Sequence, residues 1–171
     1  PVHIFDKIHF LNKEQINWHG VYKDLSWFIC GNVHENLTPF KQPKQRVAGI
    51  IGNIDENKQV HISIQRALKD DHNDIRIYGN NNAPQYWNNY VQPLLNKHSN
   101  IVKFIGYENN KQMVYNTLTD VYHSSLSENA SLVYDECKLT EVNFHGNENI
   151  VNQPIWSNAA ILKVWVNQLE L

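Results

Sequence analysis

The sequence predicts a Rossmann-like, three-layer α/β/α fold with a mostly parallel sheet. From Val47 onward, short apolar runs alternate with segments of helical periodicity, an alternation typical of α/β proteins. The chain has 171 residues with 42% hydrophobic content, enough for one ordinary domain with a sizeable core. Because crossovers between parallel strands are right-handed, this alternation places helices on both faces of one sheet.

The periodicity of apolar residues indicates the elements along the chain. Strands are predicted at 46–52, 74–79, 100–108, 119–125 and 141–146. Helices are predicted after the loop 53–57 and at 83–98, 109–118, 130–139 and 157–171. We expect Pro84 to open its helix and Pro93 to bend it. The same helix is predicted to form a packing face from Tyr86, Trp87 and Tyr90.

The first 45 residues have a different pattern. Strand candidates at 2–11 and 25–32 flank a helix candidate at 13–22, and a polar segment with prolines follows at 33–45. The predicted domains are therefore a leading strand and helix unit with an interdomain linker at 1–45, and a Rossmann-like domain at 46–171.

Composition excludes several classes of function. A net charge of -2 with interspersed charges leaves no basic stripe for nucleic acid. Cys30 and Cys137 form no C-x-x-C pair, which favours a reduced, cytoplasmic setting. No apolar run reaches the roughly 20 residues that a membrane span needs. The 9 histidines show no metal-ligand spacing; His123 stands out at a strand end, and a structural role explains it equally well.

Polar loops follow the predicted strands at the edge where parallel sheets bind ligands. They match neither the dinucleotide-binding nor the P-loop pattern. Lys58 is predicted in the first turn of a helix, where an anionic ligand would offset its unfavourable interaction with the helix dipole. An exposed lysine beside an Asn57 cap is the simpler alternative. The amides of Ser131 and Leu132 open a later helix and form a second candidate anion site.

Two glutamates, Glu128 and Glu136, surround that later helix start. Ser125 and Glu128 fit an S-x-x-E capping box, and Glu136 fits a solvated helical residue. By spacing alone, these structural interpretations are favoured over chemistry.

The order and spacing of the loops nevertheless resemble the C-terminal half of the group 1 nucleotide-sugar glycosyltransferases (glycosyltransferase family 4, GT-B fold), from Val47 to the end. Gly52 and Lys58 match a strand ending in Gly-Arg that is followed by Lys-Gly. A later strand ending in Phe-x-Gly-Tyr corresponds to Gly106 and Tyr107.

The last motif of the family reads Pro-Ser-x-x-Glu, then a small-residue turn, then Glu-Ala. Ser125 and Glu128 match its first part, and Glu136 matches the second glutamate of the family's E-x7-E pattern. The donor-binding residues that the resemblance implies are Gly52, Asn53, Lys58, Gly106, Tyr107, Ser125, Glu128, Ser131, Leu132 and Glu136.

The resemblance also implies roles for these residues. Lys58 and the amides of Ser131 and Leu132 would stabilise the charge that grows on a diphosphate leaving group. Glu136 would accept hydrogen bonds from the ribose, and Glu128 would contact the donor sugar, which makes Glu128 and Lys58 the catalytic candidates. Backbone near Gly106 and Tyr107 would meet the base. Such enzymes need no bound metal and typically retain the anomeric configuration.

The wider implications concern partners. The leading residues are similar to the end of an N-terminal domain, with Asn32 as the linker asparagine. The acceptor, a glycan or glycolipid in surface polysaccharide synthesis, would bind a preceding domain that the chain lacks, so we expect the chain alone to transfer no sugar. That domain would also allow peripheral attachment at the inner face of the membrane.

The sequence departs from the family pattern at defined positions. Asn53 replaces the phosphate-binding arginine, Ser124 replaces the proline, and Ser131 replaces a glycine of the turn. Arg66 and Lys111 are the candidate cations to compensate for the lost arginine. A catalytically degenerate binding or scaffold domain is the alternative function. A sugar-phosphate epimerase is a third, weakened by the lack of an acid/base pair with recognisable spacing.

Overall fold

The computed structural model describes residues 7–11, 26–31, 35–41, 45–128, 131–146 and 156–169. Within them the chain forms two sheets, one of five strands and one of two. The strands are β1 (Lys7–Phe10), β2 (Ser26–Ile29), β3 (Ala48–Ile51), β4 (Ile75–Tyr78), β5 (Val102–Gly106), β6 (Asp120–Tyr122) and β7 (Asn143–His145). Every strand pairing in both sheets is parallel.

The order of the larger sheet is β5-β4-β3-β6-β7. The chain starts this sheet at β3, moves outward to β4 and β5, and then returns to add β6 and β7 on the other side of β3. The direction of winding therefore reverses between β3 and β6, and ligands of open α/β sheets bind beside the carboxyl ends of the strands at such a reversal. The loops that follow β3 and β6 lie at this position.

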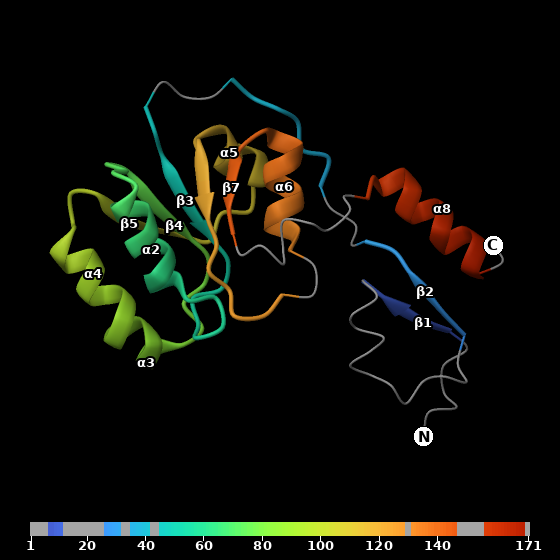
Figure 1. Cartoon of the computed structure of the whole chain (residues 1–171), viewed down its shortest axis with the longest axis horizontal. Helices are drawn as coiled ribbons and strands as arrows, with labels where there is room; N and C mark the ends of the chain where they lie inside the picture. Colours follow the sequence, from blue (N-terminus) through green and yellow to red (C-terminus); the bar gives the residue numbers. More distant parts are fainter. Residues whose placement is uncertain are drawn as a thin grey trace.

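Helices cover both faces of the larger sheet (Figure 1). The described helices are α2 (Val60–Lys69), α3 (Pro84–Tyr86), the π-helical turn η2 (Trp87–Val91), α4 (Gln92–Lys97), α5 (Lys111–Asn116), α6 (Leu132–Thr140) and α8 (Asn158–Leu169), and all but α8 pack on this sheet. One face carries α2 and the α3–η2–α4 segment, and the other carries α5 and α6. The predicted three-layer, mostly parallel α/β fold is confirmed. None of the described helices is long and apolar enough to cross a membrane.

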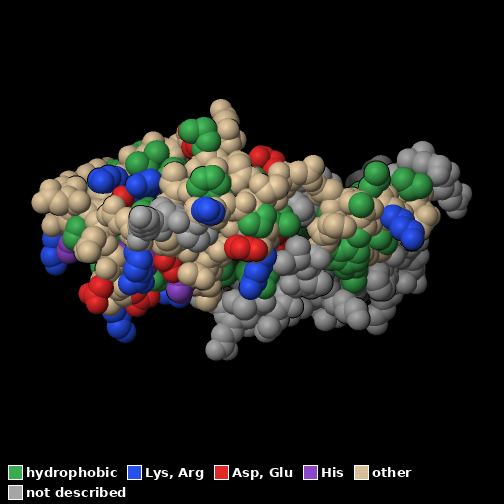
Figure 2. All heavy atoms as spheres, turned by 90° about the horizontal axis from the view of Figure 1, so that it is seen from above, with side chains coloured by type: hydrophobic (Ala, Val, Ile, Leu, Met, Phe, Trp, Pro, Cys, Tyr) green, Lys and Arg blue, Asp and Glu red, His purple; other side chains and the backbone are tan. Residues whose placement is uncertain are grey.

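The closing helix α8 packs on the small β1–β2 sheet, to one side of the larger sheet (Figure 1). Phe28, Cys30 and Ile161 form the buried centre of this unit. The outer side of α8 carries two exposed apolar residues, Leu162 (64% exposed) and Val166 (36% exposed), and Figure 2 shows hydrophobic side chains over this part of the molecule. The helix predicted at 13–22 and the linker Asn32 lie outside the described residues, and the domain boundary after residue 45 stays a prediction.

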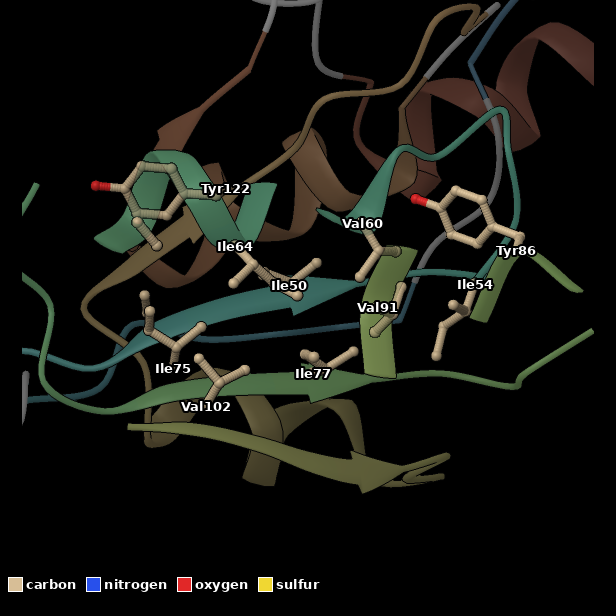
Figure 3. Close-up of a cluster of buried hydrophobic side chains, with 12 residues drawn as sticks. Ile50, Ile54, Val60, Ile64, Ile75, Ile77, Tyr86, Val91, Val102 and Tyr122 are labelled. Atoms are coloured by element: carbon tan, nitrogen blue, oxygen red, sulfur yellow. The ribbon is translucent and has the colours of Figure 1, made fainter. Parts of the chain in front are cut away.

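The main core lies between the sheet and the α2 side (Figure 3). Ile64 of α2 and Ile75 and Ile77 of β4 have 0% exposed surface. Burying an aliphatic side chain of this size contributes about 1.5–3 kcal/mol. The second core covers the opposite face, where Leu118, Val121 and Cys137 are fully buried. Packing in the two cores holds the strands in place, and the candidate site lies at the C-terminal edge of these strands.

The helix predicted at 83–98 forms, with one change of geometry. Pro84 occupies the first turn of α3 as predicted, and the chain widens to the π-turn η2 just before Pro93. Proline lacks an N–H group and its ring collides with the carbonyl four residues earlier, which explains a local widening. Tyr86 is 2% exposed and Tyr90 is 51% exposed. The Tyr90 ring still packs against the His61 and Tyr86 rings, with centroids 5.0 and 5.4 Å apart, so Tyr90 lies at the exposed edge of the packing face.

The segment 35–41 is held against α5. Leu37 is buried in the second core, and the Thr38 amide donates to Gln112 Oε1 at 3.0 Å, while Gln112 Nε2 donates to the Thr38 carbonyl at 3.1 Å. The polar segment predicted as a linker is thus anchored on the helix that precedes β6.

Candidate functional site

The predicted site residues lie at the C-terminal edge of the larger sheet in two neighbouring groups. The Glu128 cluster consists of Lys58, His123 and Glu128 and lies at the reversal between β3 and β6. The Glu136 pocket is a cavity of about 150 Å³ beyond the ends of β3, β4 and β5. Its lining comprises Ile51, Gly52, Asn53, Tyr78, Gly79, Asn80, Tyr107, Glu108, Lys111, Val114, Tyr115 and Glu136.

Hydrogen bonds between two loops position the Glu128 cluster. The Leu126 amide donates to the Asn57 carbonyl at 2.8 Å. Asn57 Nδ2 donates to Ser125 Oγ and to the Ser127 carbonyl, both at 3.3 Å, and Ser125 Oγ donates to the Ser127 carbonyl at 3.0 Å. Ser125 is 2% exposed. Its role in the structure is therefore to hold the loop that presents Glu128.

The Glu128 carboxylate has two partners and little solvent. Its Oε1 forms an ion pair with Lys58 Nζ and lies 3.3 Å from His123 Nε2. The Glu128 side chain is 12% exposed. Burial alone raises the pKa of a carboxyl group, but hydrogen bonds from His123 and Lys58 outweigh burial and lower the Glu128 pKa to about 2. Glu128 is consequently an anion at neutral pH.

Two structural interpretations of these residues are wrong. Helix α2 begins at Val60 after Gln59 in a left-handed conformation without a side-chain cap, so Lys58 lies in the preceding turn and Asn57 is no cap. The Lys58 amide instead donates to Asp55 Oδ1 at 2.9 Å. The capping box is equally excluded, because the described part of α6 begins at Leu132 and is capped by the Ser131 hydroxyl, which accepts from the Tyr134 amide at 3.3 Å.

Glu136 lines the Glu136 pocket and is buried, which overturns the interpretation as a solvated helical residue. It is 2% exposed. Lys111 Nζ donates to its Oε1 at 2.5 Å, and the Tyr115 hydroxyl donates to its Oε2 at 2.7 Å. Burial lowers the Lys111 pKa, but the hydrogen bond to Glu136 and the negative charges of Glu136 and Glu35 together outweigh burial and raise it overall. Burial also raises the Tyr115 pKa, so this phenol stays a hydrogen-bond donor.

Glycines stand at the C-terminal ends of three neighbouring strands. Gly52, Gly79 and Gly106 end β3, β4 and β5 with φ of +143°, +146° and +88°, a region that L side chains rarely adopt. A Cβ atom on Gly52 would lie 3.9 Å from the Lys58 methylenes, and Gly52 also lines the pocket. Gly52 therefore adjoins both the Glu128 cluster and the Glu136 pocket.

The structure distinguishes the two cations considered for Asn53. Asn53 and Lys111 line the same pocket. Arg66 instead donates to the His123 carbonyl at 3.3 Å and to Ser124 Oγ at 3.2 Å. Lys111 is therefore the better-placed substitute, although in this structure its ammonium is bonded to Glu136.

The remaining predicted residues are Gly106, Tyr107, Ser131 and Leu132. Tyr107 is 66% exposed at the mouth of the pocket, and Gly106 ends β5 with open space around it. Ser131 and Leu132 open α6, directly after residues 129–130, which are outside the described part of the chain. Within that part, no group of three or more His, Cys, Asp or Glu side chains is arranged to hold a metal ion.

Sequence reasoning missed Tyr115 and named Lys111 only as a spare cation. The two stand four residues apart on α5, so they share one face of the helix. That spacing is a weak indication, because no residue pattern within α5 predicts that this face contacts Glu136 of α6.

Comparison with known proteins supports the fold. No protein-family model matches the sequence, and no curated protein matches it. TarM resembles the chain with a TM-score of 0.69 at 15% identity over 99% of the chain, and a TarM mutant from S. aureus is known with UDP. HepE from Anabaena, in complex with UDP and glucose, gives 0.69 at 14% identity over 96% of the chain. WaaG, a glycosyltransferase of lipopolysaccharide biosynthesis, gives 0.60 at 15% identity over 90%.

These structural neighbours are glycosyltransferases of the GT-B fold. The chain spans 37% of TarM, 53% of HepE and 46% of WaaG. The likeness at this level of identity establishes the Rossmann-like α/β fold.

Proposed function

We propose that the chain is the C-terminal, donor-binding domain of a group 1 glycosyltransferase, which moves a sugar from a nucleotide-sugar to a glycan or glycolipid acceptor. The observation that carries this proposal is the placement of Glu128 and Glu136. Glu136 is buried and Glu128 is half-buried, and both lie at the C-terminal edge of the sheet near Gly52, which adjoins Lys58 and lines the Glu136 pocket. Solved structures of the same fold contain UDP, which supports a nucleotide diphosphate as the ligand class.

The geometry suits a donor laid across the two groups. Glu136 lies in the pocket with its carboxylate held by Lys111 and Tyr115, where it would accept hydrogen bonds from the ribose hydroxyls. The base would lie against the backbone at Gly106 and Tyr107. Lys58 would then meet the diphosphate at the reversal between β3 and β6.

Charge development explains why these groups would favour transfer. As the bond between sugar and diphosphate breaks, negative charge grows on the leaving oxygen, and a fixed cation stabilises the transition state more than the bound donor. Lys58 supplies that cation, and the amides that open α6 at Ser131 and Leu132 add partial positive charge. Glu128 would orient the sugar. We propose a retaining reaction that needs no bound metal, in a cytoplasmic enzyme that contributes to surface polysaccharide synthesis.

A degenerate binding or scaffold domain is the second candidate, and one observation favours it. Asn53 carries no charge, and both glutamates already have lysine partners, Lys58 and Lys111. A pocket whose charges are already paired attracts a diphosphate less than one with a free cation. Binding of a nucleotide that depends on Glu136 would decide against this alternative.

The test is a calorimetric titration of the purified chain with UDP, GDP, ADP and CDP and their sugar conjugates. We expect weak, selective binding of one nucleotide, lost on Lys58→Ala and on Glu136→Ala in protein that circular dichroism shows to be folded. Lys97→Ala is the matched control, because Lys97 lies in the last turn of α4. Absence of binding to every nucleotide, or equal binding by all variants, would support the degenerate domain.

We further propose that the acceptor binds a preceding domain, through which the enzyme would attach to the inner face of the membrane. The chain alone is then expected to transfer no sugar, because the acceptor-binding groups are on that domain. Incubation with a radiolabelled nucleotide-sugar and a polysaccharide acceptor checks this. Labelled product from the chain alone would contradict it.

A further inference from the structure

His123 is the member of the Glu128 cluster to which no role has been assigned. It directly follows β6, and its amide donates to the His145 carbonyl at 3.0 Å. The His123 ring packs against the Phe144 ring with centroids 5.7 Å apart, and the residue is 4% exposed. Packing against β7 therefore fixes the imidazole beside Glu128.

The hydrogen bonding of the ring points toward Glu128. An ionised carboxylate accepts hydrogen bonds only, so the His123 nitrogen that faces it, Nε2 at 3.3 Å, must carry a hydrogen. The other nitrogen, Nδ1, is buried and finds no partner among the described residues. Leaving a buried polar atom without a partner costs free energy. Among the described residues, the polar contact of this ring is thus the one between Nε2 and Glu128.

Lys58 and His123 both contact Oε1 of Glu128, but different parts of the chain hold them there. Glu128 and His123 lie on one loop, which Asn57 and Ser125 pin by hydrogen bonds. Lys58 reaches the carboxylate from the other loop through a long side chain that is 25% exposed. Lys58 is consequently the partner that can leave without moving the loop.

We propose that His123 is a positioning residue, which keeps Glu128 ionised and in place when the donor diphosphate takes Lys58 away from it. This inference rests on the proposed function, in which Lys58 binds the diphosphate and Glu128 the sugar. A phosphate oxygen competes directly for the Lys58 ammonium. Without His123, Glu128 would then be a half-buried carboxylate that has lost its cation, a state that favours protonation or movement toward solvent.

The first experiment needs no nucleotide. The Glu128 carboxyl is titrated by carbon-13 NMR in Lys58→Met, Lys58→Met/His123→Gln and Lys58→Met/His123→Leu proteins. The groups that face Glu128 are Lys58 and His123, and Arg66 contacts the His123 carbonyl behind them. We expect His123→Leu to raise the Glu128 pKa by about one unit or more in this background. His123→Gln keeps a donor and should raise it less; no rise with His123→Leu would overturn the proposal.

The second experiment measures the affinity for UDP and UDP-glucose. We expect His123→Leu to weaken UDP-glucose binding about tenfold and to leave UDP within about twofold, because Glu128 would contact the sugar and Lys58 the diphosphate. His123→Gln should restore most of the loss, and His98→Leu at the end of α4 is the control. Equal loss of both ligands would assign His123 a structural role only and overturn the proposal.

The two experiments separate the two proposals. If the unsubstituted protein binds neither UDP nor UDP-glucose, the proposed donor site fails for these ligands, while the Glu128 titration still decides whether His123 holds the carboxylate. A rise of the Glu128 pKa would then support the positioning role, and an unchanged pKa would refute it.

Discussion

Gly79 shows how closely backbone segments approach at the edge of the sheet that carries the site. Its φ is +146°, and a Cβ atom would lie 1.8 Å from the Gly52 carbonyl oxygen. Both the conformation and the contact exclude a side chain. We expect Gly79→Ala to lower the free energy of unfolding by about 3 kcal/mol or more, measured by chemical denaturation.

Gly106→Ala separates the two causes. Gly106 also has a positive φ, +88°, but a Cβ there meets nothing within 4 Å. This variant should lose only the conformational part, about 1–2 kcal/mol. Equal losses in the two variants would show that the collision with the Gly52 carbonyl has little effect.

His72 makes stability depend on pH. Its side chain is 0% exposed, and Arg46 Nη2 lies 3.1 Å from its Nε2. Burial lowers the His72 pKa below the usual 6.5, Asp120 opposes this and Arg46 adds to it. Well above pH 6.5 the histidine is mostly unprotonated in both the folded and the unfolded chain. As pH falls below 6.5 the unfolded chain binds the proton first, so stability is lost down to the folded pKa.

We expect the unfolding free energy to decrease between pH 7.5 and pH 5.5, and to decrease less in His72→Gln. Chemical denaturation at the two pH values measures the difference. Burial also lowers the His61 pKa, but this contribution is the same in both proteins and cancels. An unchanged pH dependence in His72→Gln would show that folding does not lower the His72 pKa.

At the scale of elements, apolar periodicity predicted the strands and helices of the larger sheet well. β3 and β4 are short apolar runs that are buried along most of their length, and the buried residues of α2 repeat with the helical period. Element ends were less predictable, because they depend on local bonds. Helix α2 starts at Val60 after an unusual left-handed Gln59, and no residue pattern at Lys58 indicates this.

The candidate site was predictable where it depends on loop order, and not where it depends on helix packing. Lys58, Glu128 and Glu136 follow the strands whose carboxyl ends must share one edge, and the sequence placed them there. The contacts of Glu136 with Lys111 and Tyr115 require the docking of α5 on α6. That docking is a tertiary property that neither helix encodes alone.

Helix α8, at the end of the described chain, packs against the β1–β2 sheet at its beginning. A two-stranded sheet is marginally stable by itself. In the described chain, side chains of the β1–β2 unit are buried by packing against α8. The core of this unit is separate from the two cores of the larger sheet. We infer that the unit can open while the larger sheet stays folded.

Trp165 tests this separation. Its ring lies 4.9 Å from the Phe28 ring and 5.0 Å from the His9 ring, measured between centroids. Trp165→Ala removes both contacts and should destabilise the unit by on the order of 2 kcal/mol. Amide hydrogen exchange should then show faster exchange in β1, β2 and α8, with β3 and β6 unchanged. Val166→Ala is the control, because Val166 is 36% exposed; a uniform loss of protection in Trp165→Ala would mean that the described chain unfolds as one cooperative unit.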